Sequence, residues 1–171
     1  MATVLIIIAP ELFSEKELVI IMEGLDKAGF KTVLASTSKG VCTGSRQTSI
    51  TATQSLSDAQ TGNYDAVIFV GGRGAKMLFA NDDALRIAKE MSSANKLTAA
   101  ICLAPVILAN AGVLEHKHAT VAKTEVKTIE AKGASYSGPG VTVDGNLVTG
   151  SSPEYARRFG QKIIEQLIQL G

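Results

Sequence analysis

Apolar positions along the chain fall into two alternating patterns. Short continuous apolar runs are typical of buried strands. They occur at residues 3–9, 31–36, 64–72 and 97–101. Residues 14–30 differ, because Leu18, Ile21 and Leu25 follow the spacing of an amphipathic helix. Further helices are predicted at residues 81–96, 103–112, 124–133 and 153–170, and further short strands at 48–53 and 119–122.

Polar residues mark the ends of some of these segments. Ser14, followed by Glu17 three residues later, forms a capping-box pattern that predicts the start of the first helix. Asp144-Gly145 stands between alternating apolar residues, which predicts a β-hairpin over residues 141–150 with a type I′ turn.

The alternation of strands and helices predicts one α/β domain over residues 1–171, with a mainly parallel sheet covered by helices on both faces. In such sheets ligands bind outside the carboxyl ends of the strands. The segments leaving those ends are APELFSEKE, VGGRGAK, CLAP and AKTE. We therefore expect the chemistry of this chain at the edge where these segments meet.

Composition narrows the function classes. A net charge of +1 provides no electrostatic attraction for nucleic acid or for an anionic membrane surface. No apolar run approaches the roughly 20 residues of a transmembrane helix, and the first run lacks the preceding basic residues of a signal peptide. We expect a cytoplasmic protein in which Cys42 and Cys102, sixty positions apart, are reduced thiols.

Cys102 stands where the strand at 97–101 passes directly into the helix at 103–112. A side chain at so sharp a turn is lifted clear of both elements, above helix amides whose positive partial charge favours a thiolate. The geometry is that of a nucleophile elbow, although the usual flanking glycines are absent. A buried structural cysteine is the alternative, and position alone does not separate the two.

Glu17 and the glycine pair Gly71-Gly72 belong to the same predicted edge. A carboxyl group there could hydrogen-bond the sulfur of Cys102, or it could only cap the first helix. Glu15 is a rival for the same role, and spacing does not exclude it. Glycines after a strand let backbone amides approach an oxyanion, with a tight turn as the alternative. The GGRGAK segment has the spacing of neither a P-loop nor a dinucleotide-binding motif.

The two histidines are not expected to serve Cys102. His116 and His118 come after the helix that starts at the cysteine, so they should lie at the opposite edge of the sheet. A surface loop is the better interpretation of the EHKH segment. A His-x-His pair without a third ligand does not make a metal site, so neither a metal nor a cofactor is predicted.

Several segments together resemble the ThiJ/PfpI superfamily. AAICLAP is similar to its A-A-I-C-x-G/A-P nucleophile elbow, and DGNLVTG is similar to its D-G-N-L-I-T hairpin. DAVIFVGGRGA is similar to its D-x-V-x-x-P-G-G-x-x-A segment, with Val70 in place of the proline. FSEKEL with KAGFKTVLAS resembles its F-E-D-x-E-L and A-G-x-x-V-x-x-A-S stretch. The resemblance covers nearly the whole chain and implies a flavodoxin-like three-layer α/β/α sandwich with a cysteine nucleophile elbow, commonly a homodimer.

The resemblance also implies roles for individual residues. Cys102 would be the nucleophile or redox cysteine, and Glu17 would hydrogen-bond its sulfur. Backbone groups of Gly71, Gly72 and Leu103 would form the oxyanion pocket.

The departures from the family pattern concern histidine above all. Leu103 stands directly after the cysteine, where members credited with peptidase or glyoxalase activity often carry His. The deglycase branch has a His near the positions of Ala122 and Lys123. Without an imidazole near the thiol, general-base activation by histidine is lost, and Glu17 and the helix dipole would have to suffice.

Two functions follow from the resemblance. The first is a Cys102-dependent hydrolase or lyase of the glyoxalase or deglycase type, acting on small carbonyl compounds or glycated adducts; peptidase activity is not expected. The second is a non-enzymatic oxidative-stress sensor or chaperone-like protein in which Cys102 is oxidised to sulfinic acid. A binding protein that has lost its chemistry is a weaker third possibility. The expected partners are a small-molecule carbonyl substrate and a second copy of the chain.

Overall fold

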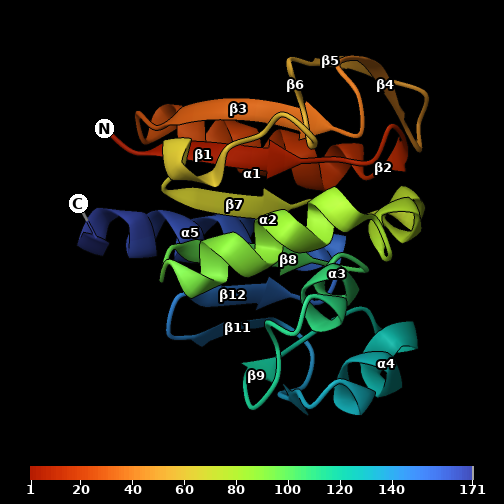
Figure 1. The fold of residues 1–171 in the computed structure, drawn as a ribbon, viewed down its shortest axis with the longest axis vertical. Helices are drawn as coiled ribbons and strands as arrows, with labels where there is room; N and C mark the ends of the chain where they lie inside the picture. The colour runs from red at the N-terminus through yellow and green to blue at the C-terminus, as the bar shows by residue number, and fades with distance from the viewer. Residues whose placement is uncertain (171) are drawn as a thin grey trace.

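A seven-stranded sheet forms the centre of the computed structural model, which describes residues 1–170. The strands lie in the order β6-β3-β1-β7-β8-β12-β11, and every neighbouring pair is parallel except β12 with β11. In that order their bounds are Gln54–Ser55, Lys31–Ser36, Thr3–Ile7, Ala66–Phe69, Leu97–Ile101, Leu147–Gly150 and Val141–Asp144. Figure 1 shows the parallel strands pointing to the right, with both termini at the left.

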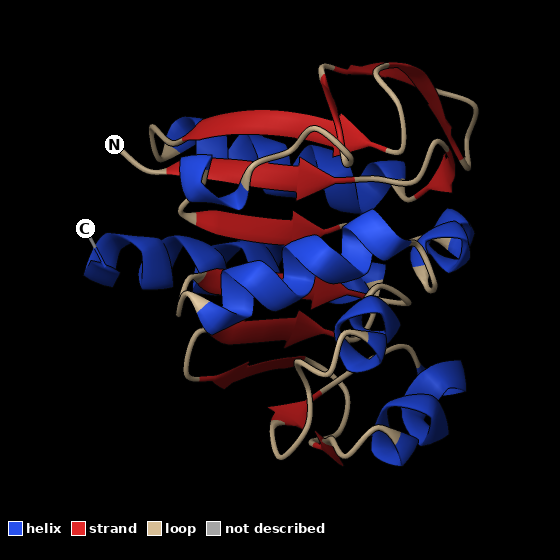
Figure 2. Ribbon diagram, in the orientation of Figure 1, coloured by secondary structure: helices blue, strands red, loops and turns tan. Residues whose placement is uncertain are grey.

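Helices cover both faces of this sheet, as Figure 2 shows. The four main helices are α1 (Glu15–Lys27), α5 (Ala156–Leu170), α2 (Asp82–Ser93) and α3 (Pro105–Asn110). Side chains along β1 alternate between the two layers: Val4 and Ile6 join the core beneath α1 and α5, whereas Leu5 and Ile7 join the core beneath α2 and α3. Burial on both faces explains the continuous apolar run. The predicted three-layer α/β fold is confirmed.

Smaller elements complete the chain. A second, three-stranded sheet contains β2 (Glu11–Phe13), β4 (Gly40–Gly44) and β5 (Ser49–Ala52). The short strand predicted at 48–53 is β5, and residues 56–58 form a turn. Short 3₁₀ helices lie at Thr61–Asn63, Arg73–Leu78, Lys123–Glu125 and Pro153–Tyr155. No helix within residues 1–170 is both long and apolar enough to cross a membrane.

The strand predicted at 119–122 does not form in the main sheet. β9 (His118–Ala119) has two residues and pairs only with β10 (Ser135–Tyr136). The physical reason lies at Thr120, whose backbone N–H donates to Thr149 Oγ1 (3.0 Å) and whose hydroxyl donates to the Gly138 carbonyl (2.7 Å). The Thr120 N–H is therefore satisfied by a side chain and not by the backbone of a neighbouring strand.

Two further predictions need correction. The helix predicted at 124–133 is divided into the 3₁₀ turn and α4 (Val126–Ala131). The hairpin of β11 and β12 forms, but its turn residues are Gly145 and Asn146, and only Gly145 (φ 61°) has a positive φ. A type I′ turn requires a positive φ at both central residues, so this turn is not of that type.

Candidate active site

The ends of three adjacent strands bring the predicted site residues together. β7 lies between β1 and β8, and Glu17, the glycine pair and Cys102 follow these three strands along the chain. The chain passes from β3 on one side of β1 to β7 on the other, which is the switch point where α/β sheets bind ligands. A Cβ placed on Gly71 would lie 2.6 Å from Cys102 Cβ and 2.9 Å from Glu17 Oε1, so Gly71 touches both residues.

Cys102 has an unusual backbone conformation. Its φ is 65°, in the left-handed region that costs a non-glycine residue about 1–3 kcal/mol. Hydrogen bonds on both sides hold it there: its N–H donates to the Gly150 carbonyl (2.9 Å) and its carbonyl accepts from the Ala122 N–H (2.8 Å). α3 begins only at Pro105, after a turn, and not at residue 103 as predicted. Strain retained at a strand-to-helix junction is characteristic of a nucleophile elbow.

Glu17 is fully buried beside this elbow. Its Oε1 accepts a hydrogen bond from the Gly71 N–H at 2.8 Å. Its Oε2 has no partner, the one buried side-chain nitrogen or oxygen in residues 1–170 of which this is true. Burial raises the pKa of Glu17 from 4.5 to about 8, against the opposing hydrogen bonds of Gly71 and Ser14. Glu17 therefore keeps its proton at neutral pH, and its Oε2 has no hydrogen-bond partner.

The thiol does not gain the acidity expected from its position. Burial raises the pKa of Cys102, and repulsion from ionised Glu17 raises it further. Hydrogen bonds from the backbone N–H groups of Gly72 and Leu103 favour the thiolate but do not outweigh these two effects. The backbone amides therefore favour the thiolate, but burial of the sulfur and the charge of Glu17 give the pKa of Cys102 a net rise.

The two glycines have different functions. Gly72 and Leu103 direct their backbone amides to the sulfur of Cys102. The Gly71 N–H is instead occupied by Glu17, so Gly71 does not contribute a free donor there. Gly72 has a φ of 100°, and a Cβ on it would lie 2.5 Å from the Ser14 nitrogen. Only glycine fits this close approach.

The structure also separates the two candidate glutamates. Glu15 turns away from the sulfur, and its carboxylate accepts hydrogen bonds from the backbone N–H groups of Arg46 (2.6 Å) and Thr48 (2.8 Å). Glu17 alone reaches the strand end beside Cys102. Ser14 caps the helix that carries both residues, because its hydroxyl accepts from the Glu17 N–H at 3.3 Å.

Comparison with known proteins identifies the family. Residues 2–166 match the family model described as the DJ-1/PfpI family. The chain belongs to the DJ-1/PfpI family. An uncharacterised protein of Methanocaldococcus jannaschii is 40% identical over 169 residues, covering 97% of this chain and 82% of that protein. Deglycase PfpI of Pyrococcus furiosus is 30% identical over 141 residues, covering 82% and 85%. The crystal structure of a ThiJ/PfpI domain protein from Brachyspira murdochii superposes with a TM-score of 0.96 at 27% identity, covering 99% and 98%.

This DJ-1/PfpI chain places its histidines away from the elbow. His116 and His118 are exposed, and the His118 N–H donates to Asp144 at the hairpin turn, at the amino end of β12. The segment that could have supplied a histidine reaches the elbow through Ala122, which has no functional side chain. Within residues 1–170, no three His, Cys, Asp or Glu side chains are grouped as ligands for a metal ion.

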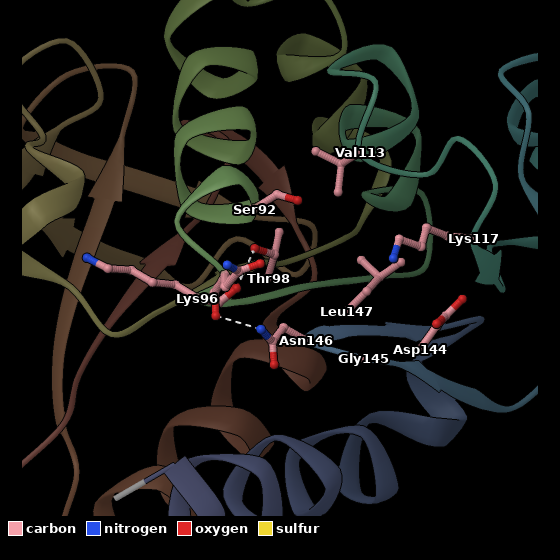
Figure 3. A pocket seen from close by; sticks show the side chains of 10 residues that line it. Ser92, Lys96, Thr98, Val113, Lys117, Asp144, Gly145, Asn146 and Leu147 are labelled. Atoms are coloured by element: carbon pink, nitrogen blue, oxygen red, sulfur yellow. Dashed lines mark hydrogen bonds between the residues drawn. The ribbon is translucent and has the colours of Figure 1, made fainter.

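A hollow of about 220 Å³ lies at the amino ends of the strands in this DJ-1/PfpI domain. Figure 3 shows side chains around it from the start of β8 (Thr98), from the residue before β9 (Lys117) and from the hairpin turn (Asn146). Lys96 points away from the hollow and donates to the Thr61 carbonyl. None of the predicted site residues lines it.

Proposed function

We propose that this DJ-1/PfpI protein is a cysteine-dependent hydrolase or lyase of the glyoxalase or deglycase type. Cys102 is the nucleophile and Glu17 is its proton partner. The unpartnered Oε2 of Glu17, a carboxyl group with a pKa of about 8, beside a thiol on a strained elbow carries this proposal. Deglycases of Thermococcus kodakarensis and Pyrococcus furiosus, 28% and 30% identical, support the reaction class.

The first chemical step is addition of the thiol to an aldehyde carbon. A general base works best when its pKa lies near the working pH, and the pKa of Glu17 is about 8. As the sulfur–carbon bond forms, the thiol proton passes to the Glu17 carboxylate and the carbonyl electrons move to oxygen. The amides of Gly72 and Leu103 stabilise that oxyanion. Return of the proton from Glu17 to the oxygen completes a neutral hemithioacetal.

An α-dicarbonyl substrate needs no external oxidant or reductant. Through an enediol, the proton on the carbon that bears sulfur moves to the neighbouring carbonyl carbon, and the hydroxyl proton moves to the neighbouring oxygen. A thioester with a 2-hydroxyl group results. Water then hydrolyses the thioester, which releases a 2-hydroxy acid and restores the thiol. The net reaction is addition of one water molecule to the dicarbonyl.

The pH profile of turnover tests this proposal. The free-enzyme kcat/KM for methylglyoxal should rise about tenfold per pH unit below the pKa of Glu17 and level off above about 8, because the carboxylate is the active form. The measurement is the rate of 2-hydroxy acid formation by purified protein. Formation no faster than with heat-unfolded protein would reject the proposed activity.

The oxidative-stress alternative receives less support. Peroxide attacks thiolates, and the raised pKa of Cys102 lowers the fraction of thiolate at neutral pH.

The single domain, the homodimer and the cytoplasmic location expected from sequence stay predictions.

A further inference from the structure

Glu15 forms a buried clamp with the turn at residues 44–48. Its side chain is 9% exposed, and its Oε1 accepts from the Arg46 N–H (2.6 Å) and the Ser45 hydroxyl (3.3 Å). Its Oε2 accepts from the Thr48 N–H (2.8 Å). Loss of solvent raises the pKa of Glu15, but the hydrogen bonds from Thr48, Arg46 and Ser45 outweigh it and hold that pKa below its usual value.

The turn that donates these bonds is shaped to receive Glu15. Gly44 begins it, and a Cβ there would lie 2.4 Å from Glu15 Cδ. The donors come from a segment about thirty residues later in the chain. That segment connects β4 and β5, in the small sheet that Figure 1 places beyond the carboxyl ends of β1 and β3.

A continuous set of hydrogen bonds leads from this clamp to Glu17. The Ser45 N–H donates to the Phe13 carbonyl (3.0 Å), and the Ser14 N–H donates to the Gly71 carbonyl (2.9 Å). Gly71 in turn donates to Glu17 Oε1. The residues entering α1 are therefore held between the 44–48 turn on one side and the end of β7 on the other.

We propose that Glu15 is a positioning residue, which clamps the 44–48 turn to the start of α1 and so holds the Glu17 carboxyl against Cys102. This inference rests on the proposed function, because it takes Glu17 and Cys102 as the reacting pair. Loosening the clamp lets the first turn of α1 move, and displacement of a reacting group by about 1 Å is sufficient to change a rate substantially.

Two variants disturb the clamp by different means. Glu15→Gln turns one acceptor into an N–H group that faces the backbone donors of the turn. Gly44→Ala leaves every hydrogen-bonding group in place, but its Cβ pushes the Glu15 carboxyl aside. Glu23→Gln, an exposed position on the same helix, is the matched control.

The test is the rate of Cys102 alkylation by iodoacetamide against pH, in a Cys42→Ser background, together with the melting temperature of each variant. We expect Glu15→Gln and Gly44→Ala to shift the profile in the same direction as Glu17→Gln, and to change the neutral-pH rate by at least about threefold. Glu23→Gln should keep the parent profile. If both clamp variants melt at lower temperatures but keep the parent alkylation profile, while Glu17→Gln shifts that profile, then Glu15 has only a structural role. This result would overturn the inference about Glu15 but not the proposed function. An unchanged profile in Glu17→Gln would overturn the proposed proton partnership as well.

Discussion

Replacing Cys102 by Ser is expected to lower the turnover of methylglyoxal by about 10³-fold or more. The substitution is close in size, so the elbow can keep its hydrogen bonds to Gly150 and Ala122. A hydroxyl is a far weaker acid than a thiol, and Glu17, with a pKa of about 8, is too weak a base to take its proton. The measurement is the initial rate of 2-hydroxy acid formation at saturating substrate.

Cys42→Ser is the matched control for this experiment. Cys42 is 1% exposed on β4 and packs in the core beneath α1 and α5, away from solvent. Its replacement should leave the rate per folded molecule unchanged. Equal turnover in wild type and Cys102→Ser would show that the thiol is not the nucleophile.

Glu17→Gln is expected to remove most of the fall in stability that the wild type shows between about pH 5 and pH 8. In the unfolded chain this carboxyl loses its proton near 4.5, whereas the folded protein keeps it until about 8. The native state therefore binds more protons across this window, so the free energy of unfolding falls as pH rises, by about 1.4 kcal/mol per unit. The total is on the order of 5 kcal/mol above pH 8, where both states are ionised.

Glutamine preserves the local geometry in this comparison. Its amide oxygen can accept from the Gly71 N–H as Oε1 does, and it cannot ionise. Urea unfolding at several pH values gives the free energy of unfolding of each protein, and the difference between them isolates the contribution of residue 17. Glu23→Gln on the exposed face of α1 should follow the wild type. Parallel curves for wild type and Glu17→Gln would contradict the raised pKa of Glu17.

Local sequence signals were sufficient to predict the strands that carry the site. The apolar runs of β1, β7 and β8 and the cap at Ser14 are encoded by neighbouring residues, so their positions could be predicted. The convergence of Glu17 and Cys102 followed from the rule that parallel strands end at one edge.

Other features depend on contacts between distant segments. Glu15 and Glu17 both lie in the first turn of α1, and only the fold of the 44–48 turn distinguishes them. The direction of the Cys102 pKa depends on how deeply the sulfur is enclosed, which a strand-to-helix junction does not reveal. The segment after β9 shows a similar limit, because Thr120 is satisfied by the side chain of Thr149 on another strand.

The proton that Glu17 keeps at neutral pH is the most direct test of the proposed chemistry. The infrared difference spectrum between wild type and Glu17→Gln reports the protonation state of this one carboxyl group. We expect the carbonyl band of a buried carboxylic acid at about pH 6, weakening as the pH rises through about 8. A spectrum that shows only the ionised carboxylate at about pH 6 would contradict the raised pKa of Glu17 and the pH dependence of turnover predicted from it.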